Sequence, residues 1–497
     1  MLLTKTDFKE YLLCHKSLWL KKNKPELYTP GEFSLFLEKI LKDGNEVEAY
    51  VQKLFPKGVL IEGSNIILVS KTRELLVDRG TLFQATFETP AGLFAKIDIL
   101  QWNTVTEQWD IYEVKASAEI KSDLKHNHLK DITFQTLVAE EVLGQDTVGE
   151  SYIIYINKDY RRGETLDLEQ LFIFENVTEA VATMREEVQK ETREALTQLA
   201  EEHISYESCP CLYRTNGQRC DTFFFFNPDV PAYSVHHIVS GKKLATLIAM
   251  GVFAIEAIPD DFTLTPIQRK KVELVKSGQA VIDKPAIKEQ LEKFSFPVYF
   301  LDYETYASPI PLLPGYKANQ AVVFQVSVHR LETNGTLSHF EYLAHDFAHA
   351  TQGLVKMLRE TIGPVGDIVV WYESFEKGRN KELAELHPEA SEFFMDLNER
   401  IFDLMKVFTQ YYADPNFGGS FSIKNVLPVL LPELSYKTLE IQNGTMALSE
   451  WEKMVRGNMT EAYRLETREN LLRYCELDTR AMVELYQALR KKVFNSI

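Results

Sequence analysis

Four acidic side chains and one phenol in the second half of the sequence have a spacing that could hold metal ions. Asp302 and Glu304 lie two residues apart in a predicted strand, so their carboxylates share one face. Glu376 follows a second strand and opens a helix, while Tyr474 and Asp478 lie four apart on a later helix. Such a set can hold two Mg²⁺ or Mn²⁺ ions that promote phosphodiester hydrolysis, with a Tyr hydroxyl orienting the water. The alternative is that each acid is an ordinary surface charge.

A second set of candidate catalytic residues lies in the first half. Asp98 falls in a predicted strand at 95–100, and Glu113 and Lys115 fall at the end of another predicted strand, 109–114. Alternation along the strand places Glu113 and Lys115 on one face. Asp98 and Glu113 can hold one or two metal ions, while Lys115 can stabilise a developing charge or help position a water. Glu-x-Lys is a common sequence, and a surface ion pair is the competing interpretation.

The elements that must position the C-terminal acids are strands first, then alternating helices and strands. An Asn-Gly pair at 334–335 is a hairpin signal between two of these strands. The predicted strands cover 297–301, 321–330, 336–344 and 367–371, and the predicted helices cover 353–361, a segment starting near 377, and 467–491. Three successive strands followed by alternating elements is the order of the ribonuclease H-like fold.

A chain of 497 residues is too long for one hydrophobic core, so we expect two or three domains. A long helix is predicted near 178–203, and the Phe-rich segment 223–234 is predicted to be a docked connector. Thr265-Pro266, with Gln268 three residues after the Thr, predicts a capped helix start. We therefore predict an α/β protein with domains 1–225 and 291–497, separated by a helical connector at 226–290.

Composition restricts the class of protein. A net charge of −17 argues against a passive DNA coat, which would match phosphates with basic residues, but carboxylate sites for metals are compatible with it. The N-terminus is interrupted by charged residues and does not resemble a signal peptide. The longest apolar run, 244–255, is shorter than the about 20 residues of a membrane helix and predicts a buried helix instead. We expect a cytoplasmic protein with no membrane partner, and the oligomeric state is left open.

The C-terminal motifs resemble those of the proofreading-type exonucleases of the DEDD superfamily (DnaQ-like), in the subgroup with a Tyr four residues before the last Asp (DEDDy). The resemblance implies that Tyr474 positions the water and that Asp403 is a structural or accessory acid. One departure is Glu376, where the family usually carries Asp. The implied metal ligands are Asp302, Glu304, Glu376 and Asp478.

The N-terminal motifs resemble the PD-(D/E)XK nuclease core, and specifically the RecB-like nucleases associated with CRISPR systems. That resemblance implies an extra metal ligand at Glu48 and a substrate-contacting Gln135 on the helix after the core. Ala139 departs from the family, which carries Tyr there. More broadly, Tyr-Phe-Leu-Asp-Tyr-Glu-Thr at 299–305 and Ser-Phe-Glu-Lys-Gly-Arg at 374–379 resemble a bacterial two-domain family whose C-terminal half is a domain of unknown function.

Four of the five cysteines are distributed as in the iron–sulfur members of the RecB-like group, with one near the start and three after the core. Their number suits a [4Fe–4S] cluster or a structural zinc ion, and ordinary reduced cysteines are the alternative. Cys475 lies on the predicted 467–491 helix, where we expect it in the core. The four candidate ligands are Cys14, Cys209, Cys211 and Cys220.

Together these patterns predict a DNA-processing enzyme with two metal-dependent nuclease sites, acting on single strands or duplex ends. The C-terminal site is predicted to be a 3′–5′ exonuclease. RNA is the alternative substrate, because the same carboxylates cleave either sugar backbone. A third interpretation is a nucleic-acid-binding assembly module with degenerate sites, which Glu376 and Ala139 favour.

Overall fold

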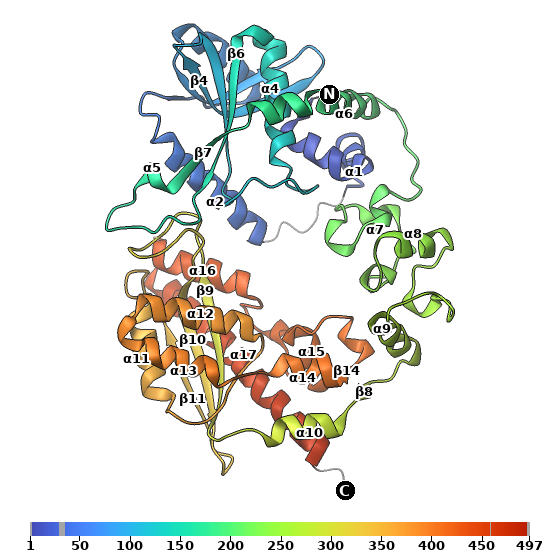
Figure 1. The fold of residues 1–497 in the computed structure, drawn as a ribbon, viewed down its shortest axis with the longest axis vertical. Helices are drawn as coiled ribbons and strands as arrows, with labels where there is room; N and C mark the ends of the chain where they lie inside the picture. Colours follow the sequence, from blue (N-terminus) through green and yellow to red (C-terminus); the bar gives the residue numbers. More distant parts are fainter. Residues whose placement is uncertain (1, 29–34, 458, 495–497) are drawn as a thin grey trace. The chain divides into compact units, whose positions relative to one another are not determined.

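The computed structural model describes residues 2–28, 35–457 and 459–494. The chain divides into two compact α/β units (Figure 1). Unit 1 comprises Met1–Ala254 and Pro309–Ala318, and unit 2 comprises Ile255–Ser308 and Asn319–Ile497. The boundary expected near 225 lies within unit 1 and the one near 290 within unit 2, so the expected connector is shared between the units. No helix in the described ranges is both long and apolar enough to cross a membrane.

Unit 1 is built around a mixed sheet with the strand order β2-β3-β4-β5-β6-β7, and β1 pairs with β4. The predicted hairpin is confirmed, because β4 and β5 are antiparallel and contain the segments 95–100 and 109–114. β5 and β6 are parallel, and helix α4 connects them. The strands are β1 Leu3–Thr4, β2 Val59–Leu60, β3 Thr81–Glu88, β4 Leu93–Asn103, β5 Gln108–Val114, β6 Val148–Ile156 and β7 Phe172–Asn176.

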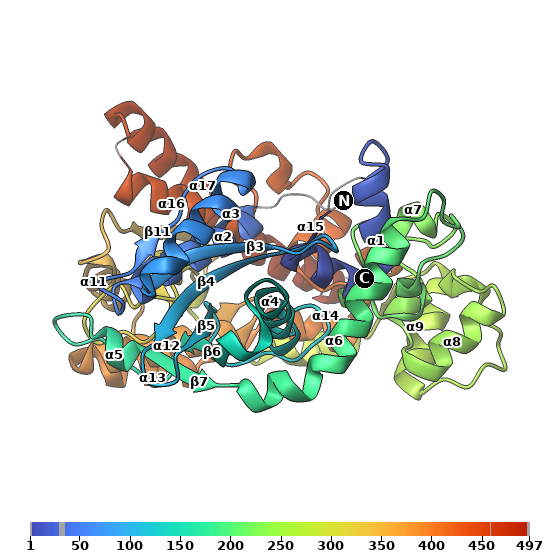
Figure 2. The ribbon, with the colours of Figure 1, turned by 90° about the horizontal axis from the view of Figure 1, so that it is seen from above.

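Helix α4 packs against the sheet of unit 1 beside α6 (Figure 2). Ile132, Phe134 and Val138 of α4 are fully buried in a core with strand residues such as Ile97 and Ile111, because the helix turns an apolar face to the sheet. The helices are α1 Lys5–Asn23, α2 Leu35–Gln52, α3 Asn65–Leu75, α4 His128–Leu143, α5 Leu168–Leu171, α6 Thr178–Leu199, α7 Phe223–Phe226 and α8 Gly241–Ala249. The predicted helix at 178–203 is α6, and the apolar run after 244 only partly overlaps α8.

Unit 2 contains a five-stranded sheet with the order β11-β10-β9-β12-β13. β9, β10 and β11 are antiparallel neighbours, whereas β12 and β13 run parallel to β9. The four predicted strands are confirmed, as is the hairpin turn between β10 and β11. The strands are β9 Val298–Tyr306, β10 Val322–Leu331, β11 Leu337–Leu343, β12 Ile368–Val370 and β13 Ile401–Asp403, while β8 Val281–Ile282 and β14 Tyr412–Ala413 form a separate pair.

Alternation along β9 separates an apolar core face from a face that carries Asp302 and Glu304. Tyr299, Leu301 and Tyr303 enter the apolar core formed with α11, α12 and α13. Residues of the opposite parity face helix α17, which packs against β9 and β10 (Figure 1) and whose Tyr486 ring lies 5.6 Å from the ring of Phe300. Asp302 therefore lies on the face that α17 covers.

Nine helices of unit 2 fall within the described residues. α9 begins with the predicted capping box at Thr265 and Gln268. α12 begins at Glu373, so Glu376 lies in its first turn rather than at its opening as predicted. The helices are α9 Pro266–Ser277, α10 Lys284–Glu292, α11 Ala350–Thr361, α12 Glu373–Leu386, α13 Ser391–Glu399, α14 Leu404–Tyr411, α15 Ile423–Leu430, α16 Gly444–Arg456 and α17 Glu461–Phe494.

Candidate metal-dependent active sites

Three carboxylates converge between β9 and α17 of unit 2. Asp302, Glu304 and Asp478 each offer one oxygen, and these oxygens all lie within 4.8 Å of one another. Glu304 and Asp478 are buried, with 9% and 8% of their surfaces exposed. The two-residue spacing on β9 and the packing of α17 against it explain the convergence, since both elements turn their acids to the same interface.

The electrostatics of this carboxylate triad favour a cation. Burial, together with the charge of Asp478, raises the pKa of Glu304 to about 8. Burial raises the pKa of Asp478 to about 6, although a hydrogen bond from Tyr436 opposes this change. Burial and repulsion from its two neighbours raise the pKa of Asp302 well above its ordinary value. Three ionised carboxylates at this spacing repel each other, which makes their ionised state unfavourable in the folded protein. A bound divalent ion would offset that repulsion.

Two tyrosines and a lysine border the triad. The Tyr436 hydroxyl donates a 2.6 Å hydrogen bond to Oδ1 of Asp478. Tyr474, one turn before Asp478 on α17, is buried, and its hydroxyl lies 3.3 Å from the Nζ of Lys424. Lys424 also donates to the Gln442 carbonyl at 2.9 Å, which fixes its ammonium beside the acids. Its positive charge lowers the pKa values of all three triad carboxylates.

Glu376 lies outside the triad among the residues that the structure describes. It is buried in the first turn of α12, and its Oε2 has no hydrogen-bond partner within the described residues. Burial, with repulsion from Asp403, raises its pKa to about 8, and its charge also contributes to the raised pKa of Asp302. Asp403 has a structural contact, since its Oδ1 accepts the Met405 N–H at 3.0 Å and so caps α14.

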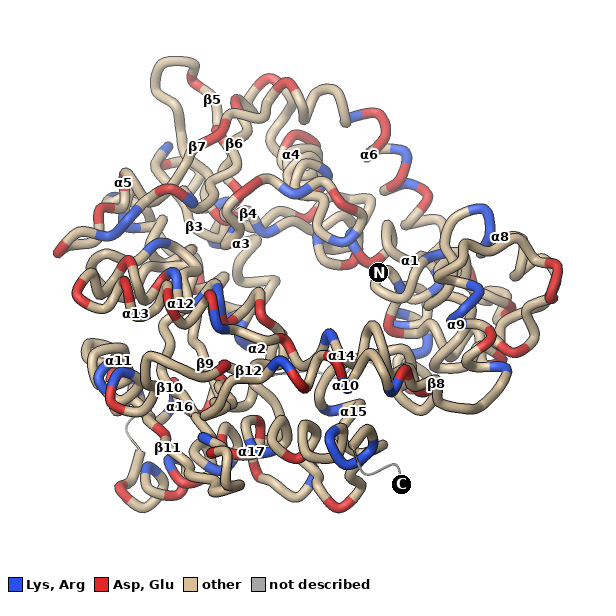
Figure 3. Tube along the Cα trace, turned by 60° about the horizontal axis from the view of Figure 1, so that its bottom comes forward, with Lys and Arg blue, Asp and Glu red and all other residues tan. Residues whose placement is uncertain are grey.

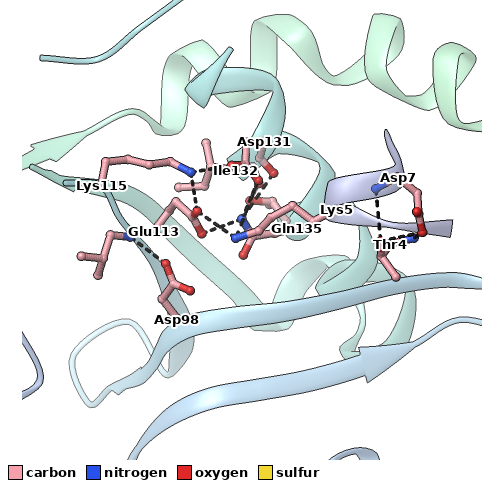
Figure 4. A network of polar contacts seen from close by, with 11 residues as sticks. Thr4, Lys5, Asp7, Asp98, Glu113, Lys115, Asp131, Ile132 and Gln135 are labelled. Atoms are coloured by element: carbon pink, nitrogen blue, oxygen red, sulfur yellow. Dashed lines mark hydrogen bonds and ion pairs between the residues drawn. The ribbon is translucent and has the colours of Figure 1, made fainter. Parts of the chain in front are cut away.

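In unit 1 the predicted residues form a buried polar network (Figure 4). Glu113 accepts hydrogen bonds from Lys115 at 2.6 Å and from Gln135 at 2.7 Å. Its Oε1 also lies 2.9 Å from the Nζ of Lys5, at the start of α1. Asp131 of α4 pairs with Lys115 and accepts from Gln135 at 3.1 Å. The network therefore contains the predicted Glu113 and Lys115 together with Lys5 and Asp131. Gln135 was expected to contact substrate; its side chain is fully buried in the network, and the substrate contact stays a prediction.

Asp98 and Glu48 add two further carboxyl groups, and both are repelled by the charge of Glu113. Asp98 accepts the Val114 N–H at 2.9 Å, and burial and repulsion from Glu113 raise its pKa well above the ordinary value. Burial also raises the pKa of Glu48. Burial opposes ionisation of Glu113 as well, but the ammonium groups of Lys115 and Lys5 outweigh it and hold the pKa of that carboxyl below its ordinary value. The carboxylates outnumber the ammonium groups, which suits a cation.

Gln84, which has a strained backbone conformation, holds the side chain of Glu48 in place. Gln84 in β3 has φ +60°, the left-handed region that non-glycine residues rarely adopt, and the pairing of β3 with β4 passes over this position without a change of register. Its side-chain amide donates to Oε1 of Glu48, which also accepts from Gln52 at 3.0 Å. Strain of this kind persists only where surrounding structure maintains it, and it concentrates at functional sites.

The lysines that follow the unit 1 core occupy different environments. Lys130 is paired with Glu187 at 2.8 Å and with Glu191, both on α6, where acidic and basic residues are interspersed (Figure 3). Lys121 and Lys125 line a pocket of about 560 Å³, together with His126 and Arg219. The backbone N–H of Lys121 donates to Nδ1 of His128, the first residue of α4, which ties this part of the pocket wall to the start of that helix.

The structure also brings the four predicted cysteine ligands together. Cys14, Cys209, Cys211 and Cys220 are all buried and unoxidised, and their sulfurs lie within 4.8 Å of one another. Cys14 has non-helical backbone angles at a kink inside α1. Cys475 is fully buried on α17, as expected, with its sulfur 3.9 Å from Oδ2 of Asp302.

Several residues of these sites were missed by the sequence reasoning. Lys424 and Tyr436 lie in a segment without a recognisable motif, and only tertiary packing brings them to the triad. Lys5 is more than a hundred residues from Glu113 in sequence, and it was interpreted only as a charge that interrupts the N-terminus. The capping box of Thr4 and Asp7 starts α1 at Lys5, a signal that could have fixed where the helix begins.

Comparison with known proteins finds similarity over part of the chain. Residues 299–422 match the family model of a domain of unknown function, DUF2779. The uncharacterized protein UU173 of Ureaplasma parvum serovar 3 is 28% identical over 142 residues, which cover 25% of this chain and 21% of that protein. The uncharacterized protein MG366 homolog of Mycoplasma pneumoniae is 29% identical over 141 residues, 26% of this chain and 21% of that protein. The chain is thus similar, over about a quarter of its length, to bacterial proteins whose names state no function.

Proposed function

We propose that the chain is a metal-dependent nuclease whose unit 2 removes nucleotides from the 3′ ends of DNA. The observation that carries this proposal is the triad of Asp302, Glu304 and Asp478, whose oxygens lie within 4.8 Å of one another in a buried site. Burial raises the pKa values of all three carboxyls, and repulsion from triad neighbours adds to this rise for Asp302 and Glu304, so a divalent cation would stabilise the ionised site. Clustered titratable groups with perturbed pKa values are a mark of functional sites.

The donor set fits hard cations. Carboxylate oxygens are the ligands that Mg²⁺ and Mn²⁺ prefer, and the buried Oε2 of Glu376 is a further oxygen without a hydrogen-bond partner among the described residues. Asp302, Glu304 and Asp478 would hold the ions, which when bound activate a water and stabilise the leaving oxygen of a phosphodiester. Tyr474 supplies a hydroxyl that can orient the water, and Lys424 supplies an ammonium that can bind a phosphate oxygen.

Strand order supports the same interpretation. β9, the first strand of the unit 2 sheet along the chain, is central, and β10, β11, β12 and β13 flank it in the arrangement third-second-first-fourth-fifth. That order, with the second strand antiparallel, is typical of ribonuclease H-like folds. An acid-bearing first strand and a late helix crossing it are what the resemblance to DEDDy exonucleases requires, and β9 and α17 have these positions.

Unit 1 is proposed to carry a second nuclease site of the PD-(D/E)XK type. Asp98 and Glu113 lie on neighbouring strands of a hairpin, and Lys115 is paired with Glu113. Asp131 holds the other side of Lys115, which fixes the ammonium for charge stabilisation. The adjoining pocket carries Lys121, Lys125, His126 and Arg219, which can bind phosphates despite the overall negative charge of the chain.

One alternative to this proposal concerns the substrate, and another concerns whether the protein has catalytic activity. RNA is an alternative substrate, because carboxylate-held cations act on either sugar backbone. A nucleic-acid-binding module without turnover is the other, and it is favoured by the position of Glu376 outside the triad and by Ala139 in place of a family Tyr. The binding module predicts retention of labelled DNA without product under every divalent cation tried.

The test compares degradation of end-labelled single-stranded DNA, duplex DNA and RNA by wild type, Asp98→Ala and Asp302→Ala in Mg²⁺ and Mn²⁺. We expect Asp302→Ala to lose stepwise shortening from the 3′ end and Asp98→Ala to lose the remaining cleavage. Glu466→Ala, at an exposed position of α17, is the matched control. Equal degradation by all four proteins would make the assignment wrong, and a preference for RNA would change the substrate.

A further inference from the structure

The four thiols of unit 1 form a compact cluster. All four side chains are at least 95% buried, and their sulfurs lie within 4.8 Å of one another. The sulfurs of Cys209 and Cys220 are 3.9 Å apart, and no disulfide joins any of the four. From this geometry we infer that Cys14, Cys209, Cys211 and Cys220 bind one tetrahedral zinc ion and not the iron–sulfur cluster that the family resemblance implies.

The size of the cluster decides between the two metal groups. Zinc–thiolate bonds are about 2.3 Å long, so tetrahedral coordination places the sulfurs about 3.8 Å apart. A [4Fe–4S] cubane has an iron at each of four corners with the thiolates outside them, which separates the thiolate sulfurs by about 6 Å. The separation of 3.9 Å and the 4.8 Å limit for the set match a single ion and leave no space for a cubane.

Groups around the sulfurs suit a zinc tetrathiolate, which has a net charge of about −2. The side-chain amide of Asn227 donates to the sulfur of Cys209 at 3.4 Å, and the Arg214 guanidinium donates to that of Cys211 at 3.5 Å. Thr222 places its hydroxyl 3.6 Å from the sulfur of Cys220. Donors of this kind orient metal-bound thiolates and offset their charge.

The proposed ion has a structural role, since four protein ligands leave no position for substrate. It would tie the kink of α1 at Cys14 to the segment 209–220, almost two hundred residues away in sequence. α1 begins with Lys5, whose ammonium reaches Glu113 in the polar network. The ion would thereby hold α1 in the position that delivers Lys5, and it would fix Leu13 and Arg219 in the wall of the adjoining pocket.

The test is metal and sulfide analysis of the full chain purified without oxygen, so that an oxygen-sensitive cluster would survive. We expect about one zinc per chain, no acid-labile sulfide and no broad visible absorption. Replacing zinc with Co²⁺ in the wild-type protein should give the intense ligand-field bands of a tetrahedral tetrathiolate site. This readout needs no variant and no nuclease activity.

The zinc content of cysteine variants tests which thiols bind the ion. Cys209→Ser should lower the zinc content from about one ion per chain to none, while Cys475→Ser, which removes the buried thiol of unit 2, should leave it unchanged. Iron and sulfide in cluster stoichiometry would overturn the inference. So would wild-type protein without bound metal whose four thiols react freely with a thiol reagent after unfolding, or zinc retained by Cys209→Ser.

Discussion

Replacing Glu304 with Gln should stabilise the metal-free protein at alkaline pH while weakening its stabilisation by divalent cations. Burial and the charge of Asp478 raise the Glu304 pKa from its ordinary 4.5 to about 8. Raising a pKa by one pH unit corresponds to about 1.36 kcal/mol, so keeping this carboxylate ionised in the fold costs at most about 5 kcal/mol. Since Asp302 and Asp478 ionise more readily once Glu304 is neutral, the measurable gain is smaller, about 2–3 kcal/mol.

The direction of the stability change with pH follows from the difference in the Glu304 pKa between the folded and unfolded states. Below pH 4.5 the carboxyl is protonated in both the folded and unfolded states, so its raised pKa costs no stability there. As pH rises towards 8 the unfolded chain ionises while the folded chain resists, and wild type loses stability that Glu304→Gln keeps. The difference between the two proteins should therefore be small at acidic pH and largest above pH 8.

Thermal unfolding in EDTA at pH 5 and pH 8.5, followed by the same scans with Mn²⁺, provides the assay. We expect a higher melting temperature for Glu304→Gln at pH 8.5. Mn²⁺ should raise the melting temperature of wild type more than that of Glu304→Gln, because ligand binding stabilises the folded state and the variant keeps only the proposed unit 1 site intact. Glu466→Gln, on the exposed face of α17, controls for charge removal. A stability difference independent of pH, or equal stabilisation of both proteins by Mn²⁺, would refute the reasoning.

Three further predictions use other positions. Lys424→Met removes the charge that lowers the pKa values of the triad, so the rise of nuclease activity with pH should move upward by about one pH unit in a pH–rate profile. Lys5→Met should abolish cleavage by the unit 1 site, measured in an Asp302→Ala background, because Glu113 loses one of its two ammonium partners. Gly366→Ala should lower stability by about 3 kcal/mol or more in thermal unfolding, since φ is +97° and a Cβ would overlap the carbonyl oxygen of Pro297. Gly335→Ala, at φ +85° with nothing within 4 Å, should cost less.

The parts of unit 2 predicted correctly depend on local periodicity. Alternation along β9 and the four-residue spacing on α17 fix which side chains share a face, and both elements were recognisable from short apolar or amphipathic runs. The hairpin at Asn334 and Gly335 was predictable because few residues tolerate the backbone angles of such turns. Local patterns of this kind depend on residues close together in sequence, so they can be recognised without knowledge of the tertiary structure.

The parts that could not be predicted depend on tertiary packing. Lys424 and Tyr436 reach the triad from a segment between α14 and α16 that has no motif of its own, so nothing in the sequence assigns them to it. Glu376 was expected among the metal ligands from motif order, but α12 begins at Glu373 and places Glu376 within its first turn. Its buried carboxyl lies outside the three oxygens that are within 4.8 Å of one another, and its role as a metal ligand stays a prediction.

Unit 1 shows the same division. The β4–β5 hairpin with Asp98 and Glu113 could be recognised from the sequence. The left-handed conformation of Gln84 could not, because it depends on the surrounding structure. The contact between Lys5 and Glu113 could not either, because it depends on tertiary packing. The cysteine set was predicted from its distribution along the chain, but its compact geometry, on which the choice of metal rests, required the structure.

The most direct test of the central claim measures the single-turnover rate of shortening of a 5′-labelled DNA strand against Mn²⁺ concentration for wild type and Asp478→Asn. We predict a saturable rise for wild type, with a ladder of products shortened stepwise from the 3′ end, and no Mn²⁺-dependent ladder of this kind for Asp478→Asn. Asp478→Asn protein that shortens the strand at the wild-type rate with the same Mn²⁺ dependence would contradict the claim.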